Sequence, residues 1–219
     1  MYKLYWAPNT GAFAPHVMLE EIGAEYEIVV LDKKVGEHRG AAYRALNPAC
    51  KIPALMMPDG TVMAESAAIV LHLGDSHPEA GLLPSPGTPE RARLMHWLMF
   101  LASGLYEADL RWNYSERYTD DAAGAGGVKD SAAMELDRLF ALIEGHALDP
   151  GPYVLGETYS AVDVYLLMLA EWHYAPAQLY AGSRRVARVR DLLRARPAVQ
   201  RIWAQHHPQA GEGNESMHQ

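Results

Sequence analysis

The stretch Asn47–Ala67, NPACKIPALMMPDGTVMAESA, decides how the first part of this chain folds. Two short apolar runs, Ile52–Met57 and Thr61–Ala64, flank the tripeptide Pro58-Asp59-Gly60. An Asp-Gly pair between short apolar runs is a strong signal for a tight hairpin, because these residues readily adopt the positive φ angles that such turns need. We therefore predict two antiparallel strands here, followed by a helix that opens at Glu65-Ser66.

The residues on either side of this stretch extend the pattern. Tyr2–Trp6 is a compact strand candidate, Phe13–Ile22 has apolar residues at helical spacing, and Tyr26–Leu31 is a β-branched run. The order strand, helix, strand favours a parallel pair joined by a crossover helix. A short helix over Ala41–Leu46 and the helix that runs to about Ser76 complete the order β-α-β-α-β-β-α, which is a thioredoxin-like layout.

The chain changes texture after residue 77. His77–Pro89 holds four prolines and two glycines, so we predict a first domain over residues 1–77 and a linker over residues 78–88. Residues 89–207 are predicted to form an all-helical second domain, and the polar residues 208–219 a frayed tail. The predicted helices are Pro89–Tyr118, bent near Gly104, and then Val128–Ala147, Ser160–Tyr174, Arg184–Arg194 and Pro197–His206.

Composition excludes several classes of protein. The formal charge of −8 over 219 residues argues against a nucleic-acid-binding surface, which needs a basic stripe. The one cysteine, Cys50, rules out an internal disulfide and a multi-cysteine metal site, and fits a reducing compartment. We find neither a signal-peptide pattern nor an apolar run of about 18 residues. We expect a cytoplasmic protein without a metal, a membrane partner or a nucleic-acid partner.

Three segments, in order and at the right spacing, resemble the cytosolic glutathione transferases, and the resemblance runs from about Lys3 to Trp203. The segments are Asn47–Leu55, Glu65–Ile69, and Ser160–Asp163 after Leu155–Glu157. The resemblance implies an α/β thioredoxin-like N-terminal domain and an all-α C-terminal helical bundle. It also implies glutathione as cosubstrate, a small hydrophobic electrophile as second substrate, a detoxification role and a homodimer.

Two of these segments carry the expected glutathione site. The resemblance implies a cis bond between Ile52 and Pro53, which would turn the Ile52 main chain outward to pair with a peptide ligand, as an added strand does. The alternative is an ordinary trans proline at a strand edge. At the helix start, the Ser66 amide and hydroxyl could hold the γ-glutamyl carboxylate and Glu65 its ammonium. The alternative is a plain N-cap pair.

Two basic residues are candidates for the other end of the tripeptide. Lys51 follows the cysteine, and His38 lies in a run that resembles the loop supplying such a histidine in some classes of the family. Either could bind the glycine carboxylate of glutathione. The alternative for each is a solvated surface charge.

The residues that would activate the thiol depart from the family patterns. The segment ending in Ala14-Pro15-His16 resembles the bacterial beta class, but the position of that class's cysteine falls on Gly11. The remaining donors are the Thr10 hydroxyl, the Asn9 amide, the main-chain amides of Gly11 and Ala12, and Tyr5. We choose Thr10 because a threonine hydroxyl can replace a serine's. The alternative is that Thr10 caps a turn or helix.

The second domain supplies candidates for an apolar substrate pocket and for a structural motif. Tyr106 and Trp112 could wall a hydrophobic pocket, since Tyr and Trp tolerate partial exposure. The alternative is that they belong to the bundle core. Ser160 and Asp163 match a helix N-cap in which the carboxylate reaches back to the cap residue. That motif supports the fold and carries no chemistry.

The sequence leaves three functions to separate. The first is conjugation of glutathione to an electrophile. The second is a glutathione-dependent isomerase, reductase or ether-cleaving enzyme that uses the same thiolate. The third is a catalytically silent interaction module with this fold. Retention of Glu65, Ser66 and Ile52-Pro53 argues against a silent module, whereas the unusual Asn9-Thr10-Gly11 argues for it.

Overall fold

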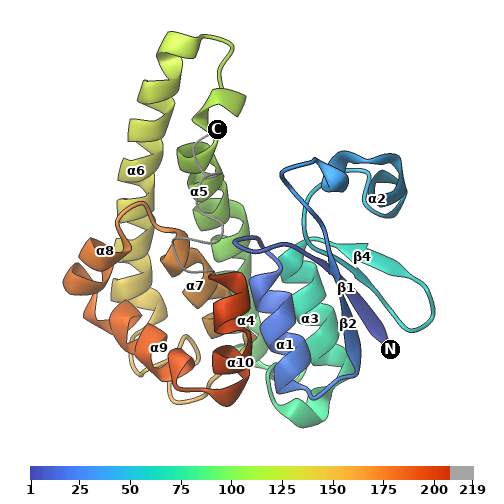
Figure 1. Ribbon diagram of the computed structural model, residues 1–219. Coiled ribbons are helices and arrows are strands. Elements are labelled where there is room, and N and C mark those ends of the chain that lie inside the picture. The colour runs from blue at the N-terminus through green and yellow to red at the C-terminus, as the bar shows by residue number, and fades with distance from the viewer. Residues whose placement is uncertain (208–219) are drawn as a thin grey trace. The chain divides into compact units, whose positions relative to one another are not determined.

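A computed structural model describes residues 1–207 of the chain (Figure 1). The fold divides into two compact units. The first comprises Met1–Leu82 together with the chain from Ala195, and the second comprises Leu83–Arg194. The predicted tail, residues 208–219, lies outside the described residues. Among residues 1–207, no helix combines the length and the apolar character needed to cross a membrane.

The first unit is built on a four-stranded sheet with the order β2-β1-β3-β4. The first two strands are parallel, and β3 is antiparallel to both β1 and β4, as the crossover and hairpin signals predict. The strands are β1 (Tyr2–Trp6), β2 (Tyr26–Val30), β3 (Ala54–Met56) and β4 (Val62–Ala64).

Side chains alternate between the two faces of the sheet along β1, so both faces carry side chains that need to be covered. Helices cover both. Leu4 and Trp6 are buried on one face, where α1 (Phe13–Glu21) and α3 (Ser66–Ser76) lie side by side (Figure 1). Tyr5 points to the other face and packs against Tyr43. Tyr43 and Leu46 both belong to α2 (Ala41–Leu46), and through them this helix covers that face.

The last helix, α10 (Pro197–His206), lies in a different unit from the one expected for it. We assigned it to the helical domain of residues 89–207, but it packs against α1 in the first unit. Two ion pairs join the helices: Arg196 Nε lies 2.7 Å from Glu21 Oε1, and Arg201 Nε lies 2.5 Å from Glu20 Oε2. Contacts between residues this far apart in the chain leave no local pattern in the sequence.

The second unit is helical, and its first predicted helix is divided. The expected helix Pro89–Tyr118 is interrupted by a π-helical turn over Leu101–Leu105, which contains Gly104, the predicted bend. Helix α8 was not predicted, because its seven residues are too few for a periodic pattern to emerge. The helices are α4 (Pro89–Phe100), α5 (Tyr106–Asn113), α6 (Ala125–Leu142), α7 (Ala161–Trp172), α8 (Pro176–Gly182) and α9 (Arg184–Arg194).

Helix α7 is the centre of the second unit, since its first ten residues are all buried. The capping box predicted at its start is present. Asp163 Oδ2 accepts from the Ser160 N–H at 2.8 Å and from the Ser160 hydroxyl at 3.1 Å. Its other oxygen, Oδ1, accepts from the Val154 N–H at 2.8 Å, so the carboxyl group also anchors the preceding loop.

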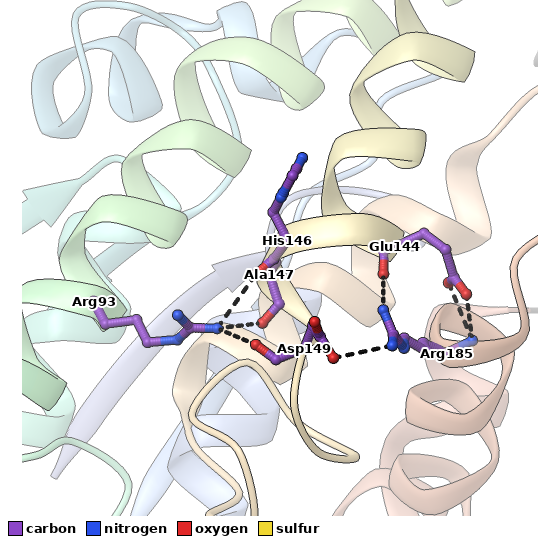
Figure 2. Close-up of polar contacts among 6 residues, drawn as sticks. All are labelled: Arg93, Glu144, His146, Ala147, Asp149 and Arg185. Atoms are coloured by element: carbon purple, nitrogen blue, oxygen red, sulfur yellow. Dashed lines mark hydrogen bonds and ion pairs between the residues drawn. The ribbon is translucent and has the colours of Figure 1, made fainter.

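Polar contacts fix the chain between α6 and α7 (Figure 2). The guanidinium group of Arg93 donates to the Ala147 carbonyl at 2.8 Å and to the Val154 carbonyl at 2.7 Å. Nearby, the Glu144 carboxylate accepts the first main-chain N–H groups of α9, including that of Arg185 at 3.0 Å. A carboxylate at a helix N-terminus satisfies amides that have no partner inside the helix.

Candidate functional site

Three segments of the first unit meet at one end of the sheet. The pairing register sets Ala54 opposite both Tyr5 and Ala64. The chain that leaves β1 after Trp6, the chain that enters β3 at Pro53, and the chain that leaves β4 at Glu65 are therefore neighbours. The residues predicted for thiol activation, except Tyr5 in β1, and most of those predicted for glutathione binding lie on these three segments.

The segment before β3 presents an unpaired piece of main chain. The bond between Ile52 and Pro53 is cis. The preceding carbonyl, that of Lys51, accepts from the Tyr43 hydroxyl at 2.6 Å and from Asn47 Nδ2 at 2.7 Å. By contrast, the Ile52 main chain makes no hydrogen bond within residues 1–207. Its N–H and C=O are therefore available to an extended peptide.

The donor that holds this segment keeps its proton. Burial raises the pKa of Tyr43 to about 12, so its phenol donates to the Lys51 carbonyl at any pH near neutral. The Tyr43 ring is itself 3% exposed and packs on the sheet. Tyr43 of α2 thus fixes the main chain at Lys51, next to Ile52.

Glu65 and Ser66 stand at the junction of β4 and α3. Ser66 is the first residue of the helix and is 6% exposed. Glu65 has φ +67°, a left-handed conformation that is costly for a non-glycine residue. Its side chain is exposed and makes no capping hydrogen bond to the helix. Glu65 is therefore not a plain N-cap side chain, and its carboxylate is free to meet a cation near the helix start.

The two basic candidates occupy different positions around α2. Lys51 follows the helix and is exposed. His38 precedes it, in a short 3₁₀ turn over Glu37–Arg39, and is half-buried. The structure thus places both residues on segments that flank α2.

In the loop after β1, the Thr10 hydroxyl is used within the loop. It donates to the Ala7 carbonyl at 2.7 Å and accepts from the Ala12 N–H at 3.3 Å. This is the turn-capping arrangement that we gave as its alternative. A hydroxyl has one proton, so Thr10 would have to break its bond to Ala7 before it could donate to a thiolate.

Asn9 is engaged differently. Its φ is +52°, and its main-chain N–H donates to the His206 carbonyl at 3.1 Å. Its side-chain amide is half-buried and makes no hydrogen bond within the described part of the chain. Three other donors were predicted. Tyr5 packs on the opposite face, with its ring centroid 5.7 Å from that of Tyr43, Gly11 is buried in the loop, and the Ala12 N–H donates to Thr10. Asn9 therefore has the freest donor of the predicted set.

Sequence reasoning missed His206, which stands directly behind this loop. Its Nε2 lies 2.6 Å from Trp6 Nε1 and 3.0 Å from His16 Nδ1. Burial lowers the pKa of His206 to about 2 and that of His16 to about 4, so both rings are neutral near pH 7. The Ala-Pro-His motif drew attention to His16, but nothing local could connect it with a residue 190 positions later.

In the second unit, each predicted pocket residue lies in an aromatic pair. Tyr106 meets Trp172 edge-on, with ring centroids 5.3 Å apart. Trp112 lies 5.8 Å from the ring of Tyr174, and Lys129 Nζ stands 4.2 Å from its centroid. Both residues are half-buried. They gather around the C-terminal end of α7, where their partners are.

Comparisons with known proteins agree with this geometry. Residues 12–76 match the model of the glutathione S-transferase N-terminal domain. The transcriptional regulator URE2 of Saccharomyces cerevisiae is 33% identical over an alignment of 146 residues that covers 59% of this chain and 41% of that protein.

Two solved structures span nearly the whole chain. A glutathione transferase of Methylococcus capsulatus is 30% identical with a TM-score of 0.78, covering 92% of this chain and 96% of its own. A glutathione transferase homologue of Sulfitobacter, solved with bound glutathione, is 26% identical with a TM-score of 0.85, covering 93% and 97%. The chain belongs to the glutathione S-transferase family.

Proposed function

We propose that this protein binds glutathione and activates its thiol for attack on a hydrophobic electrophile, as a glutathione transferase. The observation that carries the proposal is the meeting of three segments at one end of the sheet. There the unpaired main chain of Ile52 just before β3, the helix start at Ser66 and the loop at residues 7–12 lie together. The Sulfitobacter homologue, which has the same fold, was solved with bound glutathione.

In this proposal glutathione lies along the main chain that enters β3. Its cysteinyl main chain pairs with Ile52 beside Pro53, in the manner of an added strand. The amide and hydroxyl of Ser66 hold the γ-glutamyl carboxylate, which the partial positive charge of the α3 N-terminus favours. The Glu65 carboxylate faces the γ-glutamyl ammonium. Lys51 and His38 are assigned to the glycine carboxylate.

The chemical step needs the thiol to be ionised near pH 7. A free thiol of this kind has a pKa of about 8.5, and lowering it by two units takes about 2.7 kcal/mol of preferential stabilisation of the thiolate. Hydrogen-bond donors that point at the sulfur supply this. We expect the Asn9 side chain to be the main donor, with Thr10 and the Gly11 amide supporting the loop.

The thiolate then attacks the electrophilic atom of the second substrate. A carbon–sulfur bond forms as another bond to the attacked carbon breaks. The electron pair of the broken bond departs with the leaving group, stays on the oxygen of an opened epoxide, or moves along a conjugated double bond. We assign the apolar binding surface to the half-buried aromatic residues Tyr106 and Trp112. An apolar wall with a few polar groups is the usual form of a small-molecule pocket.

The binding part of the proposal is tested by calorimetry of glutathione with the whole chain. The parent protein is expected to bind the tripeptide, and Ser66→Ala to weaken binding about tenfold, since a hydrogen bond to a charged group contributes about 1.5–3 kcal/mol. Ser131→Ala, an exposed change on α6, is the matched control. A parent protein that takes up no glutathione at millimolar levels would refute the proposal.

The two loop donors are separated by substitution. Asn9→Ala is expected to raise the pKa of the bound glutathione thiol, measured by thiolate absorbance, and to lower turnover of an activated aryl halide. From the sequence we expect Thr10→Ala to lower turnover more than it weakens binding; the structure adds that this effect should be smaller than that of Asn9→Ala. The reverse order would make Thr10 the donor.

Two other functions remain candidates. The same thiolate could serve a glutathione-dependent isomerase, reductase or ether-cleaving enzyme, which a substrate panel with glutathione would reveal. A silent interaction module is favoured by the similarity to URE2, a transcriptional regulator. Such a module is expected to show no shift of the bound thiol pKa, so the absorbance titration separates it from both enzymatic functions.

We also propose that the protein is a homodimer located in the cytoplasm. Met95 and Met99, one turn apart on α4, are each 43% exposed, and Met134 on α6 is 67% exposed. Exposed apolar side chains grouped at helical spacing are typical of an interface between chains. Light scattering is expected to give twice the mass of one chain, and Met95→Glu combined with Met99→Glu to give a monomer.

A further inference from the structure

His206 joins three parts of the first unit at a single ring. It belongs to α10, is 1% exposed, and lies between the end of β1 and the start of α1. Its ring packs edge-on against Trp6 at 4.9 Å and against Phe13 at 5.2 Å. Its own carbonyl accepts the Asn9 N–H. One residue near the end of the chain therefore touches both ends of the loop at residues 7–12.

Hydrogen-bonding chemistry fixes the protonation state of this ring. The indole Nε1 of Trp6 can only donate, so the Nε2 of His206 must be unprotonated to accept from it. The same Nε2 faces His16 Nδ1 at 3.0 Å, and His16 must therefore carry its proton on Nδ1. The one lone pair of this nitrogen is thus shared by two buried donors, one from β1 and one from α1.

The contact chain continues to the surface side of α1. His16 Nε2 lies 3.0 Å from the Tyr26 hydroxyl. That hydroxyl donates its one proton to Glu20, so it meets the unprotonated Nε2 of His16 as a close contact and not as a second donor. Glu20 also pairs with Arg201 of α10. His206 and Arg201 both belong to α10, and each contacts a residue of α1. These two points of contact fix the rotation of α10 relative to α1.

We infer that His206 is a positioning residue for thiol activation: by holding Trp6, His16 and the Asn9 main chain at once, it sets the conformation in which the Asn9 side chain faces the glutathione sulfur. This inference rests on the proposed function for its catalytic meaning. Its structural part, that α10 holds the loop at residues 7–12, stands on the contacts alone.

The geometry explains why a ring with an acceptor is needed. Asn9 has φ +52°, and the hydrogen bond from its N–H to the His206 carbonyl stabilises this conformation. If the Nε2 acceptor is lost, two buried N–H groups lose their partner, and such groups move toward water or another acceptor. Trp6 and His16 border the loop on both sides, so their movement shifts Asn9 relative to the Ile52 main chain.

The test compares two variants of the whole chain. His206→Phe keeps a ring of similar size and removes the acceptor, whereas His206→Gln offers an amide oxygen to the same donors. Gln200→Ala, exposed on the same helix, is the control. For each we would measure the pKa of the bound glutathione thiol, turnover with an activated aryl halide, glutathione affinity, and amide hydrogen exchange over residues 7–12 without ligand.

We expect His206→Phe to raise the bound thiol pKa by about one unit, with a smaller change in glutathione affinity. From a starting pKa of about 6.5 this lowers the thiolate fraction, and with it turnover, about threefold at pH 7 and about tenfold well below pH 6. Amide exchange over residues 7–12 should rise at least severalfold. His206→Gln should restore both readouts most of the way, and Gln200→Ala should match the parent. If His206 acted only through the packing of its ring, His206→Gln would not restore the thiol pKa and the amide exchange.

Two results would overturn the inference. One is a folded His206→Phe protein with parental thiol pKa and parental exchange, and the other is faster exchange with an unchanged thiol pKa. If His206→Phe does not fold, Trp6→Phe removes one donor while leaving the acceptor in place, and it must then show the same direction of change. A parent protein that binds no glutathione refutes the proposed function, and the exchange measurement still decides whether α10 holds the loop.

Discussion

Asp163 gives the sharpest test of how the second unit is held together. Its carboxyl is fully buried and accepts the main-chain N–H groups of Val154 and Ser160, each at 2.8 Å. In Asp163→Ala both amides remain buried without an acceptor, and each such group costs about 1–3 kcal/mol. The two together predict a loss of about 2–6 kcal/mol in the free energy of unfolding.

The charge state of Asp163 narrows that range. Burial raises its pKa to about 7, against the pull of the hydrogen bonds it accepts. Desolvation therefore already offsets part of what the carboxylate contributes, and the loss should lie in the lower half, about 2–4 kcal/mol. Ser160→Ala removes the capping hydroxyl but leaves the Ser160 amide bonded to Asp163, and should cost about 1 kcal/mol.

Urea unfolding followed by circular dichroism measures these losses. Asp130→Ala, an exposed acid on α6, serves as the matched control and should leave the transition unchanged. The pattern expected is a large loss for Asp163→Ala, a small one for Ser160→Ala and none for the control. A loss below about 1 kcal/mol for Asp163→Ala would mean that water or a shifted loop satisfies the amides, and the reasoning would fail.

Two further predictions follow from buried charge. Asp109 on α5 is 1% exposed and its carboxyl oxygens have no hydrogen-bond partner among residues 1–207, so burial raises its pKa well above the usual range. The unfolded chain then releases this proton at a lower pH than the folded one, and stability falls as the pH rises above about 4. Asp109→Asn removes that slope, and urea melts at a series of pH values should show the variant gaining on the parent as pH rises; parallel curves would contradict it. The Glu21 side chain is 11% exposed, and its carboxylate accepts two hydrogen bonds from the Arg196 guanidinium group. Glu21→Gln weakens this ion pair and should lower stability by about 1 kcal/mol in thermal melts. Glu27→Gln, in the exposed pair with Lys3, should have a smaller effect, and equal effects would argue against a role for burial.

Local sequence signals were sufficient for most of the first unit. The bounds of β1, α2 and α10 agree with the predicted ranges, and the hairpin at Asp59-Gly60 forms as its turn residues require. In the second unit, the bounds of α9 agree as well. These elements depend on periodicity, turn chemistry and capping, which act within a few residues. The π-helical turn at Leu101–Leu105 was visible only as an expected bend at Gly104. Whether a helix bends as a kink or as a π turn depends on its packing.

The candidate site was predictable in part for the same reason. The sequence indicated which segments carry it, because Ile52-Pro53 and Glu65-Ser66 are contiguous motifs. It does not indicate where a hydroxyl proton points, so the bond from Thr10 to the Ala7 carbonyl could not be predicted from it. Nor could it associate His206 with Trp6, since the two are separated by 200 positions and meet only once α10 packs on α1.

The loop after β1 explains how the site could work without the beta-class cysteine. Thr10 holds the loop from inside, through Ala7 and Ala12, and His206 holds it from behind, through the Asn9 N–H. For Thr10 to act as the thiolate donor it would have to lose a 2.7 Å bond, at a cost of about 1 kcal/mol, and loosen the turn that positions it. The Asn9 side chain can donate without breaking any hydrogen bond in the described chain. Asn9 can therefore supply the donor while Thr10 and His206 supply the rigidity.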